Sequence, residues 1–351
     1  MKHMSYFRPQ IEAMTGYQPG EQPRGSEYIK LNTNENPYPP SPLVLEAIRR
    51  AASDRLCKYP DPMATEFRER AAILHGFKPD WILEGNGSDD LLTILTRCFV
   101  SEGHAIVAPK PSYVLYRSLA EIQGASCDEI PFDESWDLPA AFGERAGRLF
   151  FLPNPNSPSG TQLTRSRVHA LAGQLQGKAP LVVDEAYVDF ADSDCLGLVS
   201  AFDNVIVTRS LSKSYSLAGL RFGYAVARPE VVAGMIKVKD SYNCDTISIT
   251  AAVAALEDQP YFRQNIARVR ATRRRMIDAL REFGFRVPDS QANFVWCTGG
   301  PAPAQQLFQE LKNRRLLVRY MTYAGCGDGL RVSVGTDPEI DQFLDALRQL
   351  V

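Results

Sequence analysis

Short apolar runs recur through the middle of the chain, and polar stretches of helical length separate some of them. Runs of three to five apolar residues, rich in β-branched side chains, predict strands that are buried on both faces. They lie at Ala105–Ala108, Leu149–Leu152, Leu181–Val183, Val205–Val207 and Gly223–Ala227. Helices are predicted between them at Asp90–Phe99 and Thr164–Gln176. This alternation predicts an α/β fold with a mostly parallel central sheet flanked by helices, in which ligands bind at the carboxyl ends of the strands.

The two ends of the chain have a different pattern. The first 40 residues are rich in turn-forming residues, which predicts an extended arm, and a helix is predicted to begin at Pro42. After about residue 256 the pattern predicts a long helix, three strands and a final helix, at Tyr261–Phe283, Phe294–Cys297, Leu316–Arg319, Leu330–Val334 and from Asp337. We therefore expect a large domain at 41–256 and a small α+β domain at 257–351, with the arm at 1–40 belonging to the small domain.

The long helix carries five arginines, at 268, 270, 273, 274 and 275, which raises the question of nucleic-acid binding. The whole chain has 39 basic and 41 acidic residues and a net charge of −2, so no overall field attracts a polyanion. We interpret the arginines as a solvated helix face and expect no nucleic-acid partner.

Composition narrows the setting. The 351 residues are 44% hydrophobic and 23% charged, as in soluble globular proteins. No stretch approaches the ~18 consecutive apolar residues of a membrane helix, and the start of the chain lacks the apolar core of a secretory signal. Seven scattered cysteines without a C-x-x-C pair favour reduced thiols, and four histidines without metal-binding spacing predict no metal site. We expect a cytoplasmic protein that does not contact a membrane.

Four polar segments each follow a predicted strand, where this architecture places its ligand. The first contains Gly87, Ser88 and Asp89 directly before a helix. Free N–H groups at a helix N-terminus favour a phosphate, and Ser88 is expected to cap the helix. Taken alone, the segment is also typical of an ordinary strand–turn–helix connection.

The second segment places Asp184 at the end of the strand Leu181–Val183. A carboxylate in this position is costly unless it has a partner. A metal, a sugar hydroxyl or a protonated ring nitrogen would serve, and the shortage of histidine makes a metal the weakest choice. A plain capping role is the alternative.

The third segment is Ser210-Leu211-Ser212-Lys213, followed eight residues later by Arg221. A lysine just beyond a buried strand can have its pKa lowered by burial or by a neighbouring cation, which makes it a nucleophile. The two serines and Arg221 would complete a phosphate site begun at Gly87. A surface lysine is the alternative.

The fourth segment is a proline-rich turn after Leu149–Leu152 that presents Asn156 and Ser157 as neutral hydrogen-bond donors. The four segments together are more specific than any one of them. A phosphate site, a nucleophilic lysine, a strand-end aspartate and neutral donors are the groups that pyridoxal phosphate requires.

These motifs resemble those of the fold-type I pyridoxal-phosphate enzymes, specifically the class II aminotransferases and, within them, the histidinol-phosphate aminotransferase subfamily. The resemblance extends from Tyr17 to Arg331. It implies that Lys213 carries the cofactor and that Asp184 pairs with the ring nitrogen. It also implies that Tyr187 binds the phenolic oxygen, and these three residues are the expected catalytic groups.

The same resemblance implies further cofactor contacts. Tyr113 is expected to stack on the ring, and either Asn156 or Ser157 is expected to contact it, because Ser157 stands where the family usually has asparagine. Tyr59 is expected to reach the cofactor phosphate of a neighbouring subunit, which implies a homodimer. The phosphate is expected to lie among Gly87, Ser88, Asp89, Ser210, Ser212 and Arg221.

On the substrate side, the resemblance places Arg319 and Arg331 over the cofactor, where their guanidinium groups match a phosphate or a carboxylate. Tyr17 and Asn34 resemble the family's gating arm. The implied reaction exchanges an amino group between histidinol phosphate and 2-oxoglutarate in histidine biosynthesis. An aromatic amino-acid transaminase, a threonine-phosphate decarboxylase and a cofactor-binding regulator are the alternatives.

Overall fold

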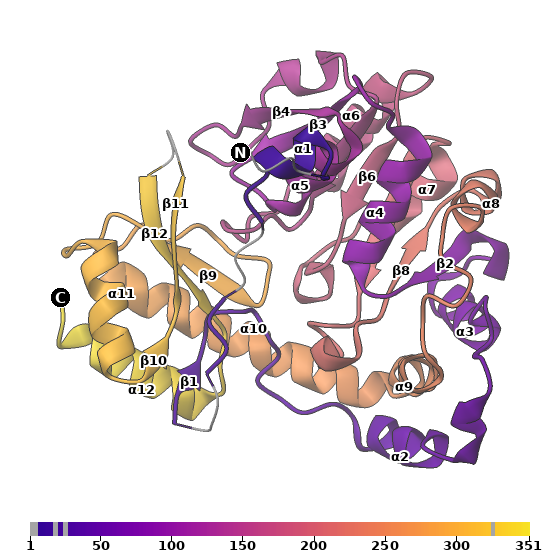
Figure 1. Cartoon of the computed structure of the whole chain (residues 1–351). Coiled ribbons are helices and arrows are strands. Elements are labelled where there is room, and N and C mark those ends of the chain that lie inside the picture. The colour runs from indigo at the N-terminus through magenta and orange to yellow at the C-terminus, as the bar shows by residue number, and fades with distance from the viewer. Residues whose placement is uncertain (1–5, 17–19, 24–26, 324–326) are drawn as a thin grey trace.

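The structure, a computed structural model, describes residues 6–16, 20–23, 27–323 and 327–351. Within these ranges, seven strands form the central sheet in the order β2-β8-β7-β6-β5-β3-β4 (Figure 1). The strands are β2 (Ile82–Gly85), β3 (Ala105–Lys110), β4 (Ser126–Pro131), β5 (Leu149–Pro153), β6 (Leu181–Asp184), β7 (Val205–Ser210) and β8 (Gly223–Val226). β3 to β7 run parallel, whereas β8 runs antiparallel to both β2 and β7. The mostly parallel sheet predicted from the sequence is therefore confirmed.

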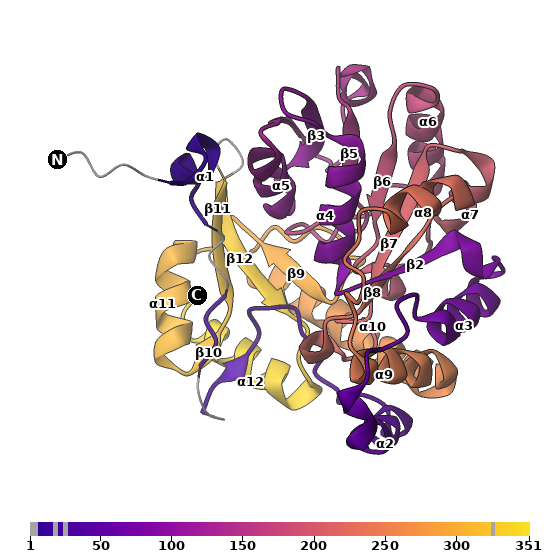
Figure 2. The same ribbon diagram turned by 45° about the vertical axis from the view of Figure 1, so that its right-hand side comes forward.

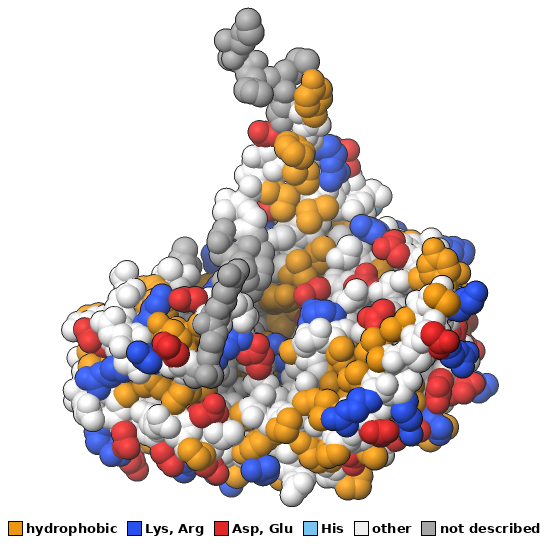
Figure 3. All heavy atoms as spheres, turned by 60° about the horizontal axis from the view of Figure 1, so that its bottom comes forward, with side chains coloured by type: hydrophobic (Ala, Val, Ile, Leu, Met, Phe, Trp, Pro, Cys, Tyr) orange, Lys and Arg blue, Asp and Glu red, His pale blue; other side chains and the backbone are white. Residues whose placement is uncertain are grey.

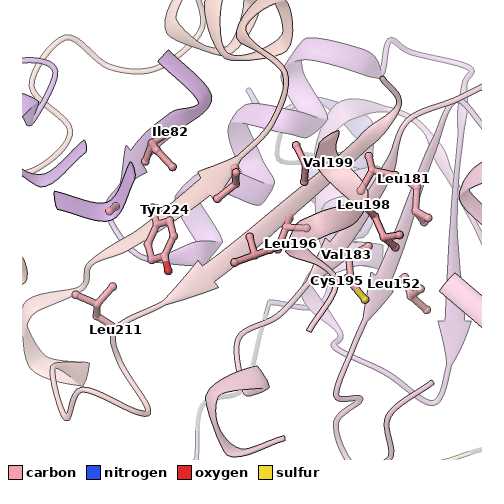
Figure 4. Close-up of a cluster of buried hydrophobic side chains, with 14 of the residues drawn as sticks. Ile82, Leu152, Leu181, Val183, Cys195, Leu196, Leu198, Val199, Leu211 and Tyr224 are labelled. Carbon is pink, nitrogen blue, oxygen red and sulfur yellow. The ribbon is translucent and has the colours of Figure 1, made fainter. Parts of the chain in front are cut away.

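Helices cover both faces of this sheet because successive strand residues point to opposite sides. Leu149 and Phe151 of β5 pack with the helices of one face, which are α4 (Ser88–Phe99), α5 (Leu115–Gln123) and α8 (Pro229–Ile236). Phe150 and Leu152 pack with the other set, which is α2 (Pro42–Ala51), α3 (Thr65–His75), α6 (Arg165–Leu175), α7 (Leu196–Ala201) and α9 (Thr246–Glu257). Figure 4 shows part of this second cluster, where Leu181 and Val183 meet Leu198 of α7. The carboxyl ends of the strands are left for polar groups.

A smaller three-stranded antiparallel sheet follows, in the order β11-β12-β9. Its strands are β9 (Phe294–Cys297), β11 (Arg319–Tyr323) and β12 (Gly327–Ser333), and its helices are α10 (Gln259–Glu282), α11 (Ala304–Asn313) and α12 (Asp337–Arg348). The predicted strand Leu316–Arg319 is split. β10 (Leu316–Leu317) pairs in parallel with β1 (Ile29–Lys30), whereas Arg319 begins a strand that pairs with β12. Short 3-10 turns occur at Asp54–Cys57, Pro79–Trp81, Ala140–Glu144, Val188–Phe190 and Ala218–Leu220.

The N-terminal arm is more ordered than its turn-rich sequence predicts. A short helix, α1 (Pro9–Ala13), lies beside α5 (Figure 2), and Arg8 donates to the carbonyl of Ile122 at 2.8 Å. Further along the arm, Leu31 and Tyr38 are buried in the apolar cluster of the C-terminal sheet and helices. The arm thus joins the C-terminal part of the fold through β1 and through its side chains. The division of the chain into domains at residues 40 and 256 stays a prediction.

The sequence predicted that the arginines of α10 form a solvated face, but two of them contact other parts of the fold. Arg273 is buried and donates to the carbonyl oxygens of Phe190 and Ala292, at 2.9 Å each. Arg268 lies over the ring of Tyr38, 3.8 Å from its centre. These two cations therefore tie α10 to other parts of the fold. Within the described ranges, no helix combines the length and the apolar character needed to cross a membrane.

Candidate active site

A cavity of about 180 Å³ lies at the carboxyl ends of β6 and β7, where the arm and strands β11 and β12 meet the large sheet. Most residues singled out from the sequence line it. They are Asn34, Ser88, Asp89, Tyr113, Ser157, Asp184, Tyr187, Ser210, Ser212, Lys213, Arg221, Arg319 and Arg331. Residues that lie up to about 300 positions apart in the chain thus meet around one hollow, as the parallel sheet predicted.

Lys213 follows β7 and points its amine into this cavity, where Nζ donates to the carbonyl of Thr33 at 3.3 Å. Burial and the nearby cation of Arg331, with a smaller contribution from Arg221, lower its pKa to about 8. The backbone is held from the arm, because Asn36 Nδ2 donates to the Lys213 carbonyl at 2.9 Å. The unprotonated amine is therefore far more abundant near neutral pH than that of an ordinary exposed lysine, which suits a nucleophile and a base.

Asp184 ends β6 with its carboxylate almost fully buried. Tyr116 Oη donates to it at 2.8 Å, and the backbone N–H of Ala186 donates at 3.2 Å. Burial raises the pKa to about 6, against these hydrogen bonds, and the negative charge of Asp89 adds to the rise. A cation placed next to this buried carboxyl group, such as a protonated ring nitrogen, would stabilise its ionised form.

The expected phosphate site is assembled from the loop before α4 and the segment after β7. Arg221 Nη1 donates to Ser212 Oγ at 3.0 Å, and Nη2 lies 3.5 Å from Asp89 Oδ2. Gly87 has a left-handed φ of 82°, and a Cβ there would meet Arg221 Nη2 at 2.7 Å. One detail of the sequence interpretation was wrong, because Ser88 is the first residue of α4 and its side chain does not cap the helix.

The two candidates in the proline-rich turn face different surroundings. Ser157 Oγ lines the cavity and accepts from Arg331 Nη1 at 3.0 Å. Asn156 is buried behind it, and its Nδ2 donates to Ser159 Oγ at 2.9 Å and to the carbonyl of Pro111 at 3.2 Å. The geometry favours Ser157 as the residue that faces a bound ring.

The two arginines expected on the substrate side lie directly opposite each other. Arg319 of β11 is paired in register with Arg331 of β12, and both line the cavity. Arg331 Nη2 donates to the carbonyl of Asn32 at 3.2 Å, and its guanidinium lies 5.3 Å from the centre of the Phe294 ring. Like charges directly across a strand pair repel each other. This arrangement therefore favours binding of an anion in the cavity, next to the two guanidinium groups.

Two other predicted contacts, Gly87 and Tyr59, lie outside the cavity wall. Gly87 packs against the guanidinium of Arg221 and does not line the cavity. Tyr59 is 81% exposed and stacks on Tyr242, with ring centres 4.4 Å apart. Tyr17 falls outside the described residues. The placement of Tyr59 leaves it accessible to a second subunit, which is what its predicted role needs.

A wider hollow of about 1120 Å³ lies elsewhere, between the loop that carries Trp136 and the segment from Arg286 to Trp296. None of the residues predicted for the site lines it. Size alone therefore does not identify the site, and the chemistry points to the smaller cavity.

Some site residues were not recognised in the sequence. Tyr116 holds Asp184, and Ser333 and Asn293 hold the arm at Asn34. Tyr116 lies in the first turn of α5, and its ring packs edge-to-face with that of Tyr113, with ring centres 5.8 Å apart. Nothing local in the sequence distinguishes Ser333 or Asn293, because their partners lie almost 300 positions away and about 260 positions away.

A family model described as "Aminotransferase class I and II" matches residues 26–347. The chain therefore belongs to the class I and II aminotransferases. Among its relatives, a histidinol-phosphate aminotransferase of Rhodopirellula baltica is 52% identical over 338 residues, which cover 95% of this chain and 93% of that protein. A histidinol-phosphate aminotransferase of Trichormus variabilis is 45% identical, with 99% of both chains covered.

The fold is also shared with solved structures. The histidinol-phosphate aminotransferase of Sinorhizobium meliloti, solved in complex with pyridoxal 5'-phosphate, has a TM-score of 0.89 and is 28% identical, and all of both chains is covered. The fold-type I architecture predicted from the sequence is thus confirmed.

The residues around the cavity fit pyridoxal phosphate. Lys213 supplies an amine for its aldehyde, Asp184 a buried carboxylate for its ring nitrogen, and Arg221 a cation for its phosphate. The bare backbone of Gly87 leaves the space that Arg221 occupies beside the helix N-terminus. The donor set therefore suits the aldehyde, the ring nitrogen and the phosphate of the cofactor.

Proposed function

We propose that this chain is a histidinol-phosphate aminotransferase that carries pyridoxal phosphate on Lys213. The reaction converts histidinol phosphate and 2-oxoglutarate into imidazole acetol phosphate and glutamate, and the physiological direction within histidine biosynthesis is the reverse. The observation that carries this proposal is the in-register pair Arg319 and Arg331 at the cavity. Full-length relatives that bear this name support it.

The bound cofactor would act as the electron sink for the carbon from which a proton is removed. The chain supplies the groups that move and hold protons around it. Lys213, with a pKa of about 8, would take the proton from the substrate carbon that bears the amino group and would return it to the cofactor carbon bonded to the same nitrogen. Asp184 keeps the ring nitrogen protonated, and Tyr187 donates to the phenolic oxygen. All three side chains line the same cavity, so each can reach a cofactor bound there.

Anion recognition explains how one site accepts two unlike substrates. Histidinol phosphate is anionic through its phosphate, whereas glutamate is anionic through two carboxylates. Arg319 and Arg331 present planar forks that suit either group. Each substrate would relieve the repulsion between these two cations when it binds.

We also propose that the enzyme is a cytoplasmic homodimer in which Tyr59 serves the partner's cofactor phosphate. Leu43, Leu45, Leu56, Tyr59 and Tyr242 are large apolar or aromatic side chains that the single chain exposes. Figure 3 shows hydrophobic side chains gathered on the side that carries α2 and α9 in Figure 1. A second copy would cover such a surface. The free thiols of the six described cysteines are consistent with a reducing compartment.

The test is an assay of the cofactor-loaded enzyme with glutamate as donor, comparing imidazole acetol phosphate with phenylpyruvate as acceptors. We expect a clear preference for imidazole acetol phosphate and loss of both turnover and visible absorbance in Lys213→Ala. A preference for phenylpyruvate would make the enzyme an aromatic amino-acid transaminase. Release of carbon dioxide from threonine phosphate would make it a decarboxylase. Cofactor binding without turnover of any of these substrates would favour the alternative of a cofactor-binding regulator.

A further inference from the structure

The hydroxyl of Tyr187 is bound from the arm rather than from its own part of the fold. Asn34 Nδ2 lies 3.0 Å from Tyr187 Oη, and both residues line the cavity. Asn34 is only 1% exposed and has a left-handed φ of 55°, a conformation that asparagine tolerates better than most residues. Its position is therefore specific and is fixed by its neighbours.

Ser333 determines which way the Asn34 amide faces. The backbone N–H of Asn34 donates to Ser333 Oγ at 2.8 Å, so that oxygen is an acceptor in this contact. The single proton of the Ser333 hydroxyl is then available for Asn34 Oδ1, which lies 3.1 Å from Oγ. With Oδ1 turned to Ser333, the amide NH2 faces Tyr187. The opposite orientation would leave the buried Ser333 hydroxyl proton without this acceptor.

The direction of the next hydrogen bond follows. Because an amide NH2 can only donate, Tyr187 Oη accepts from Asn34. The one proton of the Tyr187 hydroxyl is therefore not used by Asn34. Burial raises the pKa of Tyr187, so the proton stays on the phenol at neutral pH.

We propose that Asn34 and Ser333 are positioning residues that orient the Tyr187 hydroxyl so that it donates its proton into the cofactor cavity. This inference rests on the proposed function, because the acceptor is the phenolic oxygen of pyridoxal phosphate. Asn34 and Ser333 act through Tyr187 and need not touch the cofactor. A hydrogen bond from Tyr187 stabilises the phenolate and so lowers the pKa of the neighbouring nitrogen that joins Lys213 to the cofactor.

Strand β12 carries both Ser333, which supports Asn34, and Arg331, which is expected to bind the substrate's anionic group. Arg331 and Ser333 are two residues apart on β12 and therefore share one face of the strand. Asn293 Nδ2 donates to the carbonyl of Asn34 at 2.9 Å and fixes the arm from the adjacent segment. A displacement of β12 would thus move the substrate's arginine and the support of Tyr187 together.

The test uses Asn34→Asp, which keeps the size of the side chain and its tolerance of a left-handed φ. A carboxylate accepts and does not donate, so Tyr187 would turn its proton toward residue 34 and away from the cofactor. The readout is the pH midpoint of the visible absorbance of the loaded enzyme. We expect it to rise by about one pH unit, as for loss of one charge-assisted hydrogen bond, and we expect weaker binding of pyridoxal phosphate to the apoenzyme.

A double-mutant cycle with Tyr187→Phe separates this effect from the added negative charge. If Asn34 acts through Tyr187, the shift caused by Asn34→Asp is lost in the Tyr187→Phe background. A shift of the same size in both backgrounds would assign the effect to charge alone and overturn the inference.

Ser333 supplies neutral variants. Ser333→Ala removes the hydroxyl that fixes the amide, and we expect a smaller rise in the same midpoint, whereas Ser333→Thr keeps the hydroxyl and should keep the midpoint. An unchanged midpoint in both Asn34→Asp and Ser333→Ala, with normal absorbance, would overturn the inference and leave the proposed function intact. Failure of the unaltered protein to bind pyridoxal phosphate would instead refute the proposed function.

Discussion

The guanidinium of Arg221 lies directly against the bare backbone of Gly87. A Cβ on Gly87 would come within 2.7 Å of Nη2 and 3.2 Å of Cζ. We expect Gly87→Ala to push Arg221 away from the phosphate site. Losing one charged hydrogen bond of about 1.5–3 kcal/mol corresponds to roughly 10- to 100-fold weaker binding of pyridoxal phosphate. Titration of the apoenzyme with the cofactor measures this change.

Gly76 is a control for substitution at a left-handed φ, because it has no neighbour comparable to Arg221. It also has a left-handed φ, 73°, but a Cβ there would meet no atom within 4 Å. Gly76→Ala should cost about 1–2 kcal/mol of unfolding free energy and leave cofactor affinity unchanged. Equal losses of affinity in the two variants would contradict the role given to Arg221.

The pKa of Lys213 gives a pH-dependent prediction. Only the unprotonated amine reacts with the cofactor's aldehyde, so the rate of reloading the apoenzyme should rise with pH through a midpoint near 8. Arg331→Gln removes a cation that lowers this pKa, so the midpoint should move to higher pH. Stopped-flow absorbance measures the rate.

Arg319→Gln is the comparison for this experiment. Arg319 lines the same cavity but is not among the main charges that shift the pKa of Lys213. Its midpoint should stay near that of the unaltered enzyme. A midpoint that is unaffected by Arg331→Gln would show that Arg331 does not lower the pKa of Lys213.

Asp184 should make the stability of the apoenzyme depend on pH. Its pKa rises from an ordinary 3.8 to about 6 on folding, so the folded state binds a proton more tightly than the unfolded state. The stabilising effect is complete below about pH 4 and is lost as pH rises through 6. Asp184→Asn removes this dependence.

The difference in unfolding free energy between the two proteins should therefore change by about 2.5 kcal/mol between pH 4 and pH 7. Urea denaturation of both apoenzymes across this range measures it. Parallel stability curves would mean that Asp184 has the same pKa in the folded and unfolded chains.

Tyr59 and Tyr242 form one exposed stack, but only Tyr59 is predicted to contact a cofactor. If Tyr59 donates to the cofactor phosphate of a second subunit, Tyr59→Phe should weaken cofactor binding by roughly 10-fold while the dimer persists. Tyr242→Phe keeps the stacked ring and should leave affinity unchanged. Cofactor titration and sedimentation together check both points, and a monomeric unaltered protein would refute the shared site.

Long-range placement limited what the sequence could predict. The apolar runs of β5, β6 and β7 were recognised because they are buried on both faces. β4 was missed because it is an edge strand whose residues are mostly partly exposed, so its composition is polar. The split at Val318 was missed because it depends on pairing with β1, almost 290 residues away.

The site shows the same limit. Short sequence motifs after predicted strands made three residues recognisable, namely Lys213, Asp184 and Arg221. Tyr116 and Ser333 act only through tertiary contacts, at sequence separations of 68 and 299, and leave no local pattern. Arg273 was assigned to solvent because charged helix faces usually are, yet three-dimensional packing buries it against two carbonyl oxygens.

The way the arm joins the fold has a consequence for how the protein folds. The arm supplies the carbonyl that holds Lys213, the amide that meets Tyr187 and the side chain that anchors the Lys213 backbone. Its own support from Ser333 spans 299 residues. During synthesis the arm emerges first, but its partner on β12 emerges near the end. Loop closure over such a separation is slow, so the active site should be the last part of the molecule to form.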